Sequence, residues 1–261
     1  MQIIIPMAGQ GVRFIEKGYK DIKPLIQVGD KPMIEYIIRM FPGETNFLFI
    51  CSQAHLDNTN LRKTLNHIMP KGRVIGISPH KRGPVWSVLE AMTYINDEEP
   101  AIVNYCDFNC IWDYENFKRT VISNDCYGAI ACYRGFHPHL LGPNLYASCR
   151  VDKSNYLQEI REKYSFSENK MHSYQSSGTY YFKRGDLIKK YFQALVDQDI
   201  HVNKEYYVSL VYNLMAKDHL KTYIHEIDKF CQWGTPEDLE EFLYWLDYFQ
   251  LVQKKSYEKH S

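Results

Sequence analysis

The sequence that decides the fold lies near the amino terminus, where residues 3–14 read IIIPMAGQGVRF and residues 23–25 read KPL. The apolar run that opens this stretch has the length of a buried parallel strand. The two glycines of the loop carry no Cβ atom that would keep a phosphate group away from the backbone. Arg13 and Lys23 can neutralise the charge of a triphosphate. This order of strand, G-x-G-x-R loop and K-P favours a triphosphate-binding loop over the alternative, an ordinary glycine turn with surface bases.

Strand-like and helix-like patterns alternate through the first half of the chain. The apolar periodicity predicts strands at residues 3–7, 46–51, 73–78 and 101–105, and helices at residues 33–40, 56–68 and 85–94. Such alternation is typical of βαβ units. We therefore expect an α/β fold with a Rossmann-like mixed, mainly parallel sheet flanked by helices, and ligands at the carboxyl ends of the strands.

The second half has a different pattern of short strands, at residues 127–133, 147–152, 157–161 and 179–182, separated by polar or Gly/Pro-containing loops. No linker or internal repeat divides the chain. We expect one domain spanning residues 1–261, with a nucleotide-binding half at 1–115 and an acceptor-binding half at 116–261 that includes a C-terminal helix.

That C-terminal helix has a clear start, because Thr235, Pro236 and Asp238 supply an N-cap, an N1 proline and an acidic third position. We expect it to pack against the sheet through inward-facing apolar residues, namely Leu239, Phe242, Leu243 and Leu246. It also carries more aromatic surface than one core face needs, at Tyr244, Trp245, Tyr248 and Phe249. Burial against the domain is favoured over a subunit interface, and a homo-oligomer is the alternative.

Composition excludes several classes of partner. Thirty-one basic residues balance thirty-one acidic ones, so no global field favours nucleic acid or an anionic membrane. The amino terminus lacks a basic targeting region, and no stretch approaches the roughly 20 apolar residues that span a bilayer. Seven scattered cysteines suit reduced thiols better than a disulfide framework. We expect a cytoplasmic protein.

The loop is neither a dinucleotide-binding nor a Walker loop, because the third glycine and the G-K-[ST] element are missing. With the KPMI segment at residues 31–34, it resembles the signature of the sugar-phosphate nucleotidyltransferase family. The resemblance implies a nucleotide-diphospho-sugar transferase-like fold and dependence on Mg²⁺, for which Mn²⁺ can substitute. It implies catalytic roles for Arg13 and Lys23, and nucleotide contacts from Met7, Ala8, Gly9 and Gly11.

Two further segments are similar to the nucleotide side of that family. HKRGPVWSVLEA at residues 80–91 resembles the segment beside the nucleobase, with Gly83 and Ser87 at the matching positions. VNYCDF at residues 103–108 resembles an apolar strand that ends in an acidic metal ligand, which implies that Asp107 binds Mg²⁺. The alternative for Asp107 is a helix or turn cap, which is less favoured at the carboxyl end of a buried strand.

The acceptor side departs from the family pattern at several positions. Residues 159–163, EIREK, resemble the family's E-K-P element, except that Tyr164 replaces the proline. The resemblance implies that Glu162 contacts the acceptor and that Lys163 is a catalytic residue that binds the acceptor phosphate. Residues 176–182, SSGTYYF, place Ser176 where asparagine is usual, with Gly178 also on the acceptor side. Residues 232–239, QWGTPEDL, place Gln232 where an acidic residue often binds the metal. Gln232 or Asp228 is the candidate second metal ligand.

The resemblance implies a nucleotidyltransferase that couples a nucleoside triphosphate to a small phosphorylated acceptor and releases pyrophosphate. Within the family, the sequence with these departures is similar overall to the cytidylyltransferases that serve bacterial surface polysaccharides. This resemblance implies CTP and L-glutamine phosphate as substrates, giving CDP-L-glutamine for capsule modification. Sugar 1-phosphates and phosphocholine are alternative acceptors.

Two functions of other classes stay open at this stage. A nucleotide-sugar glycosyltransferase would take a donor that carries only a diphosphate, which needs less positive charge than Arg13 and Lys23 provide. A non-catalytic nucleotide-binding regulator would explain the loss of the acidic residue at Gln232. The nucleobase, the exact acceptor and the oligomeric state are not decided by the residues themselves.

Overall fold

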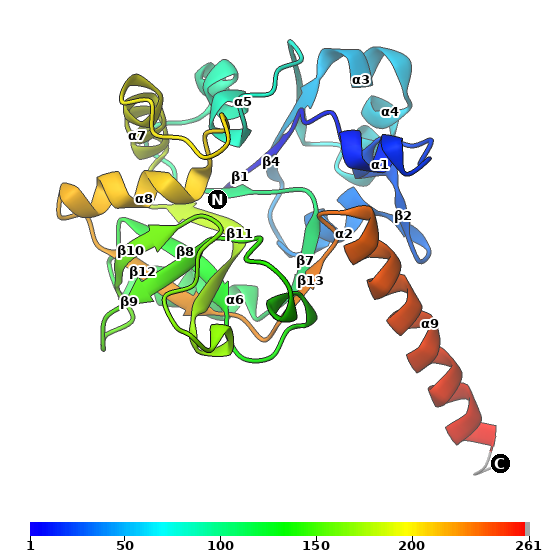
Figure 1. Ribbon diagram of the computed structural model, residues 1–261. Helices are drawn as coiled ribbons and strands as arrows, with labels where there is room; N and C mark the ends of the chain where they lie inside the picture. The colour runs from blue at the N-terminus through cyan, green and yellow to red at the C-terminus, as the bar shows by residue number, and fades with distance from the viewer. Residues whose placement is uncertain (259–261) are drawn as a thin grey trace.

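The computed structural model of the protein describes residues 1–258. A mixed sheet runs through it in the order β10-β9-β11-β6-β1-β4-β5 (Figure 1). Strand β8 also pairs with β11, and β12 pairs with β8. Strand β1 (Gln2–Met7) lies near the middle of the sheet. Its side chains alternate between two apolar cores, since Ile4 belongs to one and Ile3 and Ile5 to the other. Burial on both faces explains why this strand reads as a continuous apolar run.

The amino-terminal part of the sheet is parallel, as expected. Strand β1 pairs in parallel with β4 (Asn46–Ser52) and β6 (Ala101–Asn104), and β4 pairs in parallel with β5 (Arg73–Ile77). Helices α2 (Met33–Arg39) and α4 (Leu61–Ile68) contribute to the core on one face, and α5 (Pro84–Glu90) to the core on the other. Parallel strands end at the same edge, so their carboxyl ends meet.

The remaining strands join this sheet mainly through antiparallel pairs. The long strand β11 (Tyr174–Phe182) pairs with β6, β8 (Gly128–Tyr133) and β9 (Ser148–Val151). Strand β10 (Leu157–Arg161) pairs with β9, and β12 (Thr222–Glu226) runs parallel to β8. The sheet is therefore mixed, and β11 is the strand that connects its two parts.

The other elements are short or lie at the edges. The predicted helix at residues 56–68 is two helices, α3 (Gln53–Asn58) and α4, and the predicted helix at 85–94 ends as α5 followed by a 3₁₀ turn at Met92–Tyr94. The remaining elements are α1 (Val12–Glu16), β2 (Gln27–Val28), β3 (Lys31–Pro32), β7 (Phe108–Ile111), α6 (Tyr114–Ser123), α7 (Gly185–Asp197), α8 (Val208–Lys217), β13 (Lys229–Gln232) and further 3₁₀ turns at Lys23–Leu25, Pro138–Leu141 and Lys170–His172. Among the described residues, no helix has the length and apolar character needed to cross a membrane.

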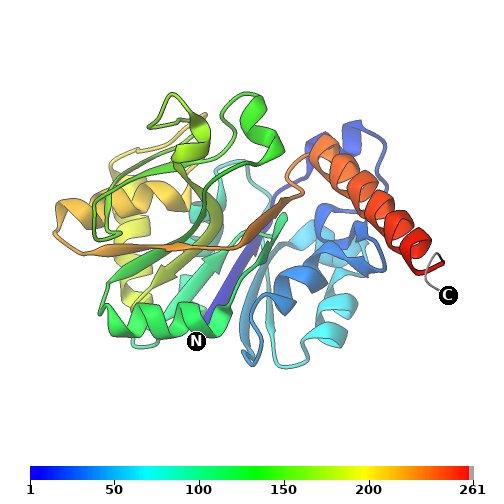
Figure 2. The ribbon, with the colours of Figure 1, turned by 90° about the horizontal axis from the view of Figure 1, so that it is seen from below.

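The expectation that the C-terminal helix packs against the sheet is wrong. Helix α9 (Pro236–Glu258) extends beyond the body of the domain (Figures 1 and 2). Its first turns pack on a small separate cluster that includes Phe14 and Trp233, with Leu239 buried and Phe242 and Leu243 partly buried. Farther along, the aromatic side chains are exposed, including Tyr244, Trp245, Tyr248 and Phe249. The predicted N-cap is confirmed, because Asp238 N donates to the Thr235 hydroxyl at 3.2 Å. A cap does not specify which surface of the protein the helix packs against.

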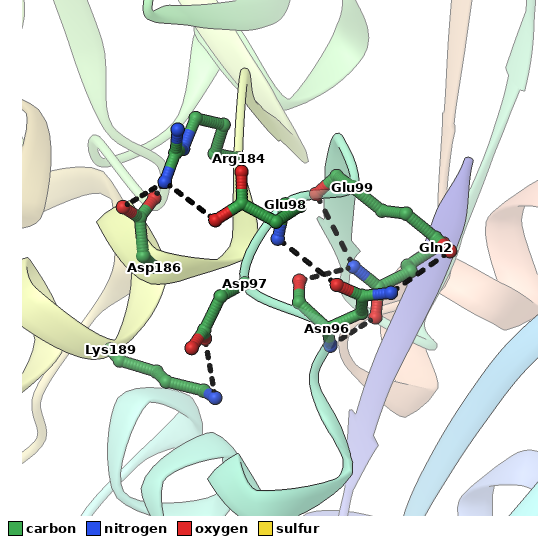
Figure 3. A network of polar contacts seen from close by, with 8 residues as sticks. All are labelled: Gln2, Asn96, Asp97, Glu98, Glu99, Arg184, Asp186 and Lys189. Atoms are coloured by element: carbon green, nitrogen blue, oxygen red, sulfur yellow. Dashed lines mark hydrogen bonds and ion pairs between the residues drawn. The ribbon is translucent and has the colours of Figure 1, made fainter.

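A polar network fastens the sheet at the edge opposite the carboxyl ends (Figure 3). The Gln2 side-chain amide donates to Asn96 O at 2.9 Å and accepts from Asn96 N at 2.8 Å. Arg184 forms ion pairs with Glu98 at 3.0 Å and Asp186 at 2.8 Å, which ties the start of α7 to the loop before β6. The network anchors the amino ends of β1 and β6, whose other ends carry the candidate site.

Candidate active site

Two adjoining cavities open at the carboxyl ends of β1 and β6. The larger, of about 510 Å³, is called here the nucleotide-side cavity and the smaller, of about 220 Å³, the acceptor-side cavity. Five residues line both cavities, namely Arg13, Tyr105, Asp107, Tyr207 and Gly234. A group held in one cavity can therefore meet a group held in the other beside the Asp107 carboxylate.

The loop at residues 8–11 forms one wall of the nucleotide-side cavity, together with Met7 and Ala8. Gly11 begins α1 with φ 63°, in the left-handed region that favours glycine. Gly9 has no such conformation, and a Cβ atom there would meet nothing within 4 Å. The chain itself therefore does not require glycine at position 9. The open space at Gly9 leaves room for a ligand to approach the backbone closely.

Asp107 and Lys23 form an ion pair at the junction of the cavities. Lys23 Nζ donates to Asp107 Oδ2 and to Gly234 O, both at 2.8 Å. The Asp107 side chain is 33% exposed, and Trp233 N donates to its main-chain oxygen at 2.9 Å. The alternative reading of Asp107 as a cap is not supported, because its carboxylate accepts from a lysine rather than from a helix amide. The carboxylate is held toward the cavities and stays accessible.

The predicted nucleobase segment lies on the far wall of the same cavity, where Gly83 and Ser87 are among the lining residues. Gly83 has φ 87°, and a Cβ atom there would lie 2.8 Å from both N and O of Tyr206. Glycine is therefore required here to bring two chain segments together. Ser87 is buried near the start of α5, where its hydroxyl oxygen lies 3.0 Å from His80 Nε2.

Glu162 and Lys163 lie in the acceptor-side cavity, where the family resemblance placed them. Burial raises the pKa of the Glu162 carboxyl to about 7, although the hydrogen bond from Ser209 and the charge of Lys163 lower it. Lys163 has φ 53°, which is unusual for a residue with a side chain, and its N–H donates to Tyr146 O at 3.1 Å. Such a conformation is often found at functional positions.

Ser176 and Gly178 also line the acceptor-side cavity, at an irregularity in β11. The Ser176 hydroxyl donates to the Tyr180 hydroxyl at 3.0 Å and accepts from Gly178 N at 3.3 Å. Gly178 has φ 101°, and a Cβ atom there would lie 2.8 Å from the Phe108 ring. Ser176, which replaces the family's usual asparagine, is therefore fixed by hydrogen bonds to other residues of β11.

Gln232 lies opposite Phe108 in the β13–β7 pair, next to Asp107 along the chain, but neither Gln232 nor Asp228 lines the two cavities. The Gln232 amide nitrogen donates to Asp238 Oδ1 at 2.7 Å, and its oxygen is buried without a partner among residues 1–258. Asp228 lies at the opposite end of the β13–β7 pair, where its N–H donates to Ile111 O. The prediction of Asp228 as a second metal ligand is therefore wrong, because the length of the β13–β7 pair separates Asp228 from Asp107.

The residues present fit a metal held by one carboxylate. Within the described part of the chain, no three His, Cys, Asp or Glu side chains gather at one point. Mg²⁺ sites in proteins commonly combine one or two carboxylates with substrate phosphates and water. Asp107, accessible at the junction of the cavities, is the residue that would hold such an ion together with the substrate.

Several lining residues were missed from the sequence. Tyr105 and Tyr207 line both cavities, and Tyr146 and Asp238 line the acceptor side. Tyr105 follows the strand that leads to Asp107, so its place next to the site could have been inferred. Tyr207 lies directly before α8 and belongs to no motif, so only the packing of the chain reveals it.

A glycine loop that lines one cavity with a carboxylate, where a second cavity meets it, fits a group-transfer enzyme that acts on a nucleotide. The model of the Nucleotidyl transferase family matches residues 2–248. The chain belongs to that family, and it is a nucleotidyltransferase. A comparison with curated proteins found no match.

Solved structures share the fold. The nucleoside-diphosphate-sugar pyrophosphorylase from Vibrio cholerae RC9 has a TM-score of 0.74 and 20% identity, over 93% of this chain and 100% of that one. A UDP-glucose pyrophosphorylase in complex with UDP-glucose has a TM-score of 0.71 and 18% identity, over 95% and 98%. The inositol-1-phosphate CTP transferase from T. maritima has a TM-score of 0.72 and 14% identity, over 93% and 94%. These similarities confirm the expected nucleotide-diphospho-sugar transferase-like fold.

Proposed function

We propose that this nucleotidyltransferase transfers CMP from CTP to a small phosphorylated acceptor, L-glutamine phosphate, giving CDP-L-glutamine and pyrophosphate in the cytoplasm for surface polysaccharide modification. The observation that carries the proposal is the Lys23–Asp107 ion pair at the junction of the two cavities. In this assignment residues 1–115 supply most of the nucleotide site, and residues 116–261 supply most of the acceptor site.

In the proposed reaction an oxygen of the acceptor phosphate attacks the α-phosphorus of the nucleotide. A new P–O bond forms, the bond from the α-phosphorus to the oxygen bridging it to the β-phosphorus breaks, and pyrophosphate leaves with that oxygen. The acceptor phosphate is already an anion, so no general base is needed. Arg13 and Lys23 stabilise negative charge on the triphosphate, and Lys163 orients the acceptor phosphate.

Bound Mg²⁺, or Mn²⁺ in its place, would supply further positive charge on the phosphate oxygens. Asp107 would hold it. In the free chain Lys23 already neutralises the Asp107 carboxylate at 2.8 Å, so Asp107 alone offers little net charge to a cation. We therefore expect metal and triphosphate to bind together rather than the metal alone.

Three observations support the specific substrates. The sequence bears an overall likeness to cytidylyltransferases of surface polysaccharides, and it departs from the family pattern at Tyr164, Ser176 and Gln232. A CTP transferase that acts on inositol 1-phosphate shares the fold. Glu162 and Lys163 both line the acceptor-side cavity, and a carboxyl together with an ammonium suits an acceptor that carries both a cationic amine and a phosphate.

A screen for pyrophosphate release tests the proposal. CTP, UTP, ATP, GTP and dTTP are each combined with L-glutamine phosphate, phosphocholine, inositol 1-phosphate and glucose 1-phosphate, with and without Mg²⁺. We expect release with CTP, L-glutamine phosphate and Mg²⁺ together. A preference for glucose 1-phosphate would contradict the proposed acceptor and leave the nucleotidyltransferase assignment intact.

We also propose that two copies of the chain associate through the exposed side of α9. Tyr244 is 72% exposed, Phe249 56%, and Leu251 58%. Together with Trp245 and Tyr248 they offer roughly 500–700 Å² of apolar surface, close to the ~800 Å² per partner of a stable complex. Light scattering should show a dimer that the double variant Trp245→Ser, Phe249→Ser disrupts and the control Asp247→Ser does not. A monomeric wild type at micromolar concentration would refute the association.

A further inference from the structure

Two hydrogen bonds in series lead from the backbone to the wall of the nucleotide-side cavity. The N–H of Arg82 donates to His80 Nδ1 at 3.1 Å. His80 Nε2 lies 3.0 Å from Ser87 Oγ. His80 and Ser87 both line the cavity, and His80 belongs to none of the site residues inferred above.

The direction of this series follows from the chemistry of its groups. A backbone N–H can only donate, so His80 Nδ1 must accept and carries no proton. The proton of the neutral ring then resides on Nε2, which donates to Ser87 Oγ. Burial lowers the pKa of His80, so the ring is neutral near pH 7.

The Ser87 hydroxyl keeps its own proton for another partner. A serine inside a helix often returns that proton to the carbonyl four residues earlier. Here that carbonyl belongs to Gly83, and it accepts from Ser87 N at 3.4 Å. Within residues 1–258, the Ser87 side chain has no hydrogen bond other than the one with His80. Ser87 is 3% exposed and lines the cavity, so a group in the cavity can meet a hydroxyl that has no bulk water shell.

We infer that His80 is a positioning residue that makes Ser87 an obligate hydrogen-bond donor to the nucleobase. The base atom that meets Ser87 is then an acceptor, a carbonyl oxygen or an unprotonated ring nitrogen, and cytosine offers both side by side. The inference rests on the proposed function, since it requires that a nucleoside triphosphate occupies this cavity.

Calorimetric titration of the full chain with CTP and with inorganic tripolyphosphate tests this role, because tripolyphosphate has no base. One neutral hydrogen bond contributes about three- to tenfold in affinity. We expect His80→Ala to raise the Kd of CTP by that factor and to leave the Kd of tripolyphosphate unchanged. His80→Gln, whose amide can accept from Arg82 N and donate to Ser87, should restore most of the affinity. The control His55→Ala, a partly buried histidine of α3 outside both cavities, should change neither Kd.

The coupling between His80 and Ser87 provides the second readout. Ser87→Ala should weaken CTP binding as much as His80→Ala, and the double variant should lose no more than either single one. Additive losses, or an equal loss for tripolyphosphate, would overturn the inference. A wild type that binds no nucleoside triphosphate would instead refute the proposed function, so the two failures are distinguishable.

Discussion

The two cavities differ in what shapes them. In the nucleotide-side cavity the glycine loop at residues 8–11 and the close approach at Gly83 are backbone features. The acceptor-side cavity also has a close backbone approach, at Gly178, but its Glu162 and Ser176 side chains are each held by another side chain, Ser209 and Tyr180 respectively. In the proposed function a nucleoside triphosphate occupies the first cavity and the phosphorylated acceptor the second. Changes to the glycine loop should therefore act on nucleotide binding, and changes at Glu162 or Lys163 on acceptor binding.

Asp107 belongs to both cavities, so its loss should have the largest effect. We expect Asp107→Asn to lower kcat by on the order of a hundredfold or more, because the carboxylate that would hold the metal is removed. The matched control is Asp228→Asn, at the far end of the same pair of strands, which should keep nearly normal turnover. Steady-state pyrophosphate release measures both variants. Near-normal activity of Asp107→Asn would remove this residue from the site.

Lys163 tests whether the acceptor side is separate from the nucleotide side. Lys163→Ala should raise the acceptor KM by roughly tenfold to a hundredfold, because a charged hydrogen bond to the phosphate is lost. The Kd of CTP should stay unchanged in calorimetry. Lys153→Ala, in an exposed loop, is the control. An equal loss of CTP affinity in Lys163→Ala would mean that the two cavities do not divide the substrates as proposed.

Gly9 tests the claim that the backbone shapes the nucleotide site. Its Cβ atom would meet nothing in the free chain, so Gly9→Ala should leave the Tm nearly unchanged. CTP should nevertheless bind about tenfold more weakly, because the methyl group would occupy space that the phosphates approach. The control Gly142→Ala has similarly ordinary geometry and lies outside both cavities. Unchanged CTP affinity in Gly9→Ala would show that the phosphates do not approach this glycine.

Glu162 gives the acceptor side a pH dependence of stability. Its pKa rises on folding from about 4.5 to about 7 because of burial. The unfolded chain therefore releases this proton first, and the free energy of unfolding falls as pH rises from about 4.5 to about 7. Glu162→Gln should remove that loss, gaining roughly 3 kcal/mol relative to wild type at pH 8 compared with pH 4.

Denaturant unfolding at the two pH values measures this difference. The matched control is Glu159→Gln on β10, the strand that ends directly before Glu162, since hydrogen bonds from Arg161 and Arg150 lower the pKa of Glu159. It should show no such gain at high pH. The same absence of a gain in Glu162→Gln would mean that Glu162 titrates as an ordinary surface carboxyl.

The sequence predicted the nucleotide side better than the acceptor side for a physical reason. Strands buried on both faces, such as residues 3–7 and 101–105, have an unbroken apolar pattern, and a glycine loop is local in sequence. The short strands β7 and β13 carry mixed residues and pair across more than a hundred positions, so they were not predicted. The start of helix α9 was predictable from its capping residues. The exposure of its aromatic side chains was not, because no local pattern specifies which surface a helix face packs against.

The site residues follow the same division. Every residue expected on the nucleotide side lines the nucleotide-side cavity, and Glu162, Lys163, Ser176 and Gly178 line the acceptor-side one. What the sequence could not provide is how these side chains are held. The pairing of Lys23 with Asp107 and of Ser209 with Glu162 depends on contacts between distant segments. Their substrate roles remain predictions.

Transfer of the α-phosphate is the central claim, and labelled CTP tests it most directly. The enzyme is incubated with Mg²⁺, L-glutamine phosphate and CTP labelled at the α-phosphorus, and in parallel with CTP labelled at the γ-phosphorus. We predict that the α-label appears in a cytidine diphosphate conjugate of the acceptor, and that the γ-label appears in pyrophosphate in equal amount. Label from the γ-position in the acceptor product, or an α-label that stays in CTP with every acceptor of the panel, would contradict the account.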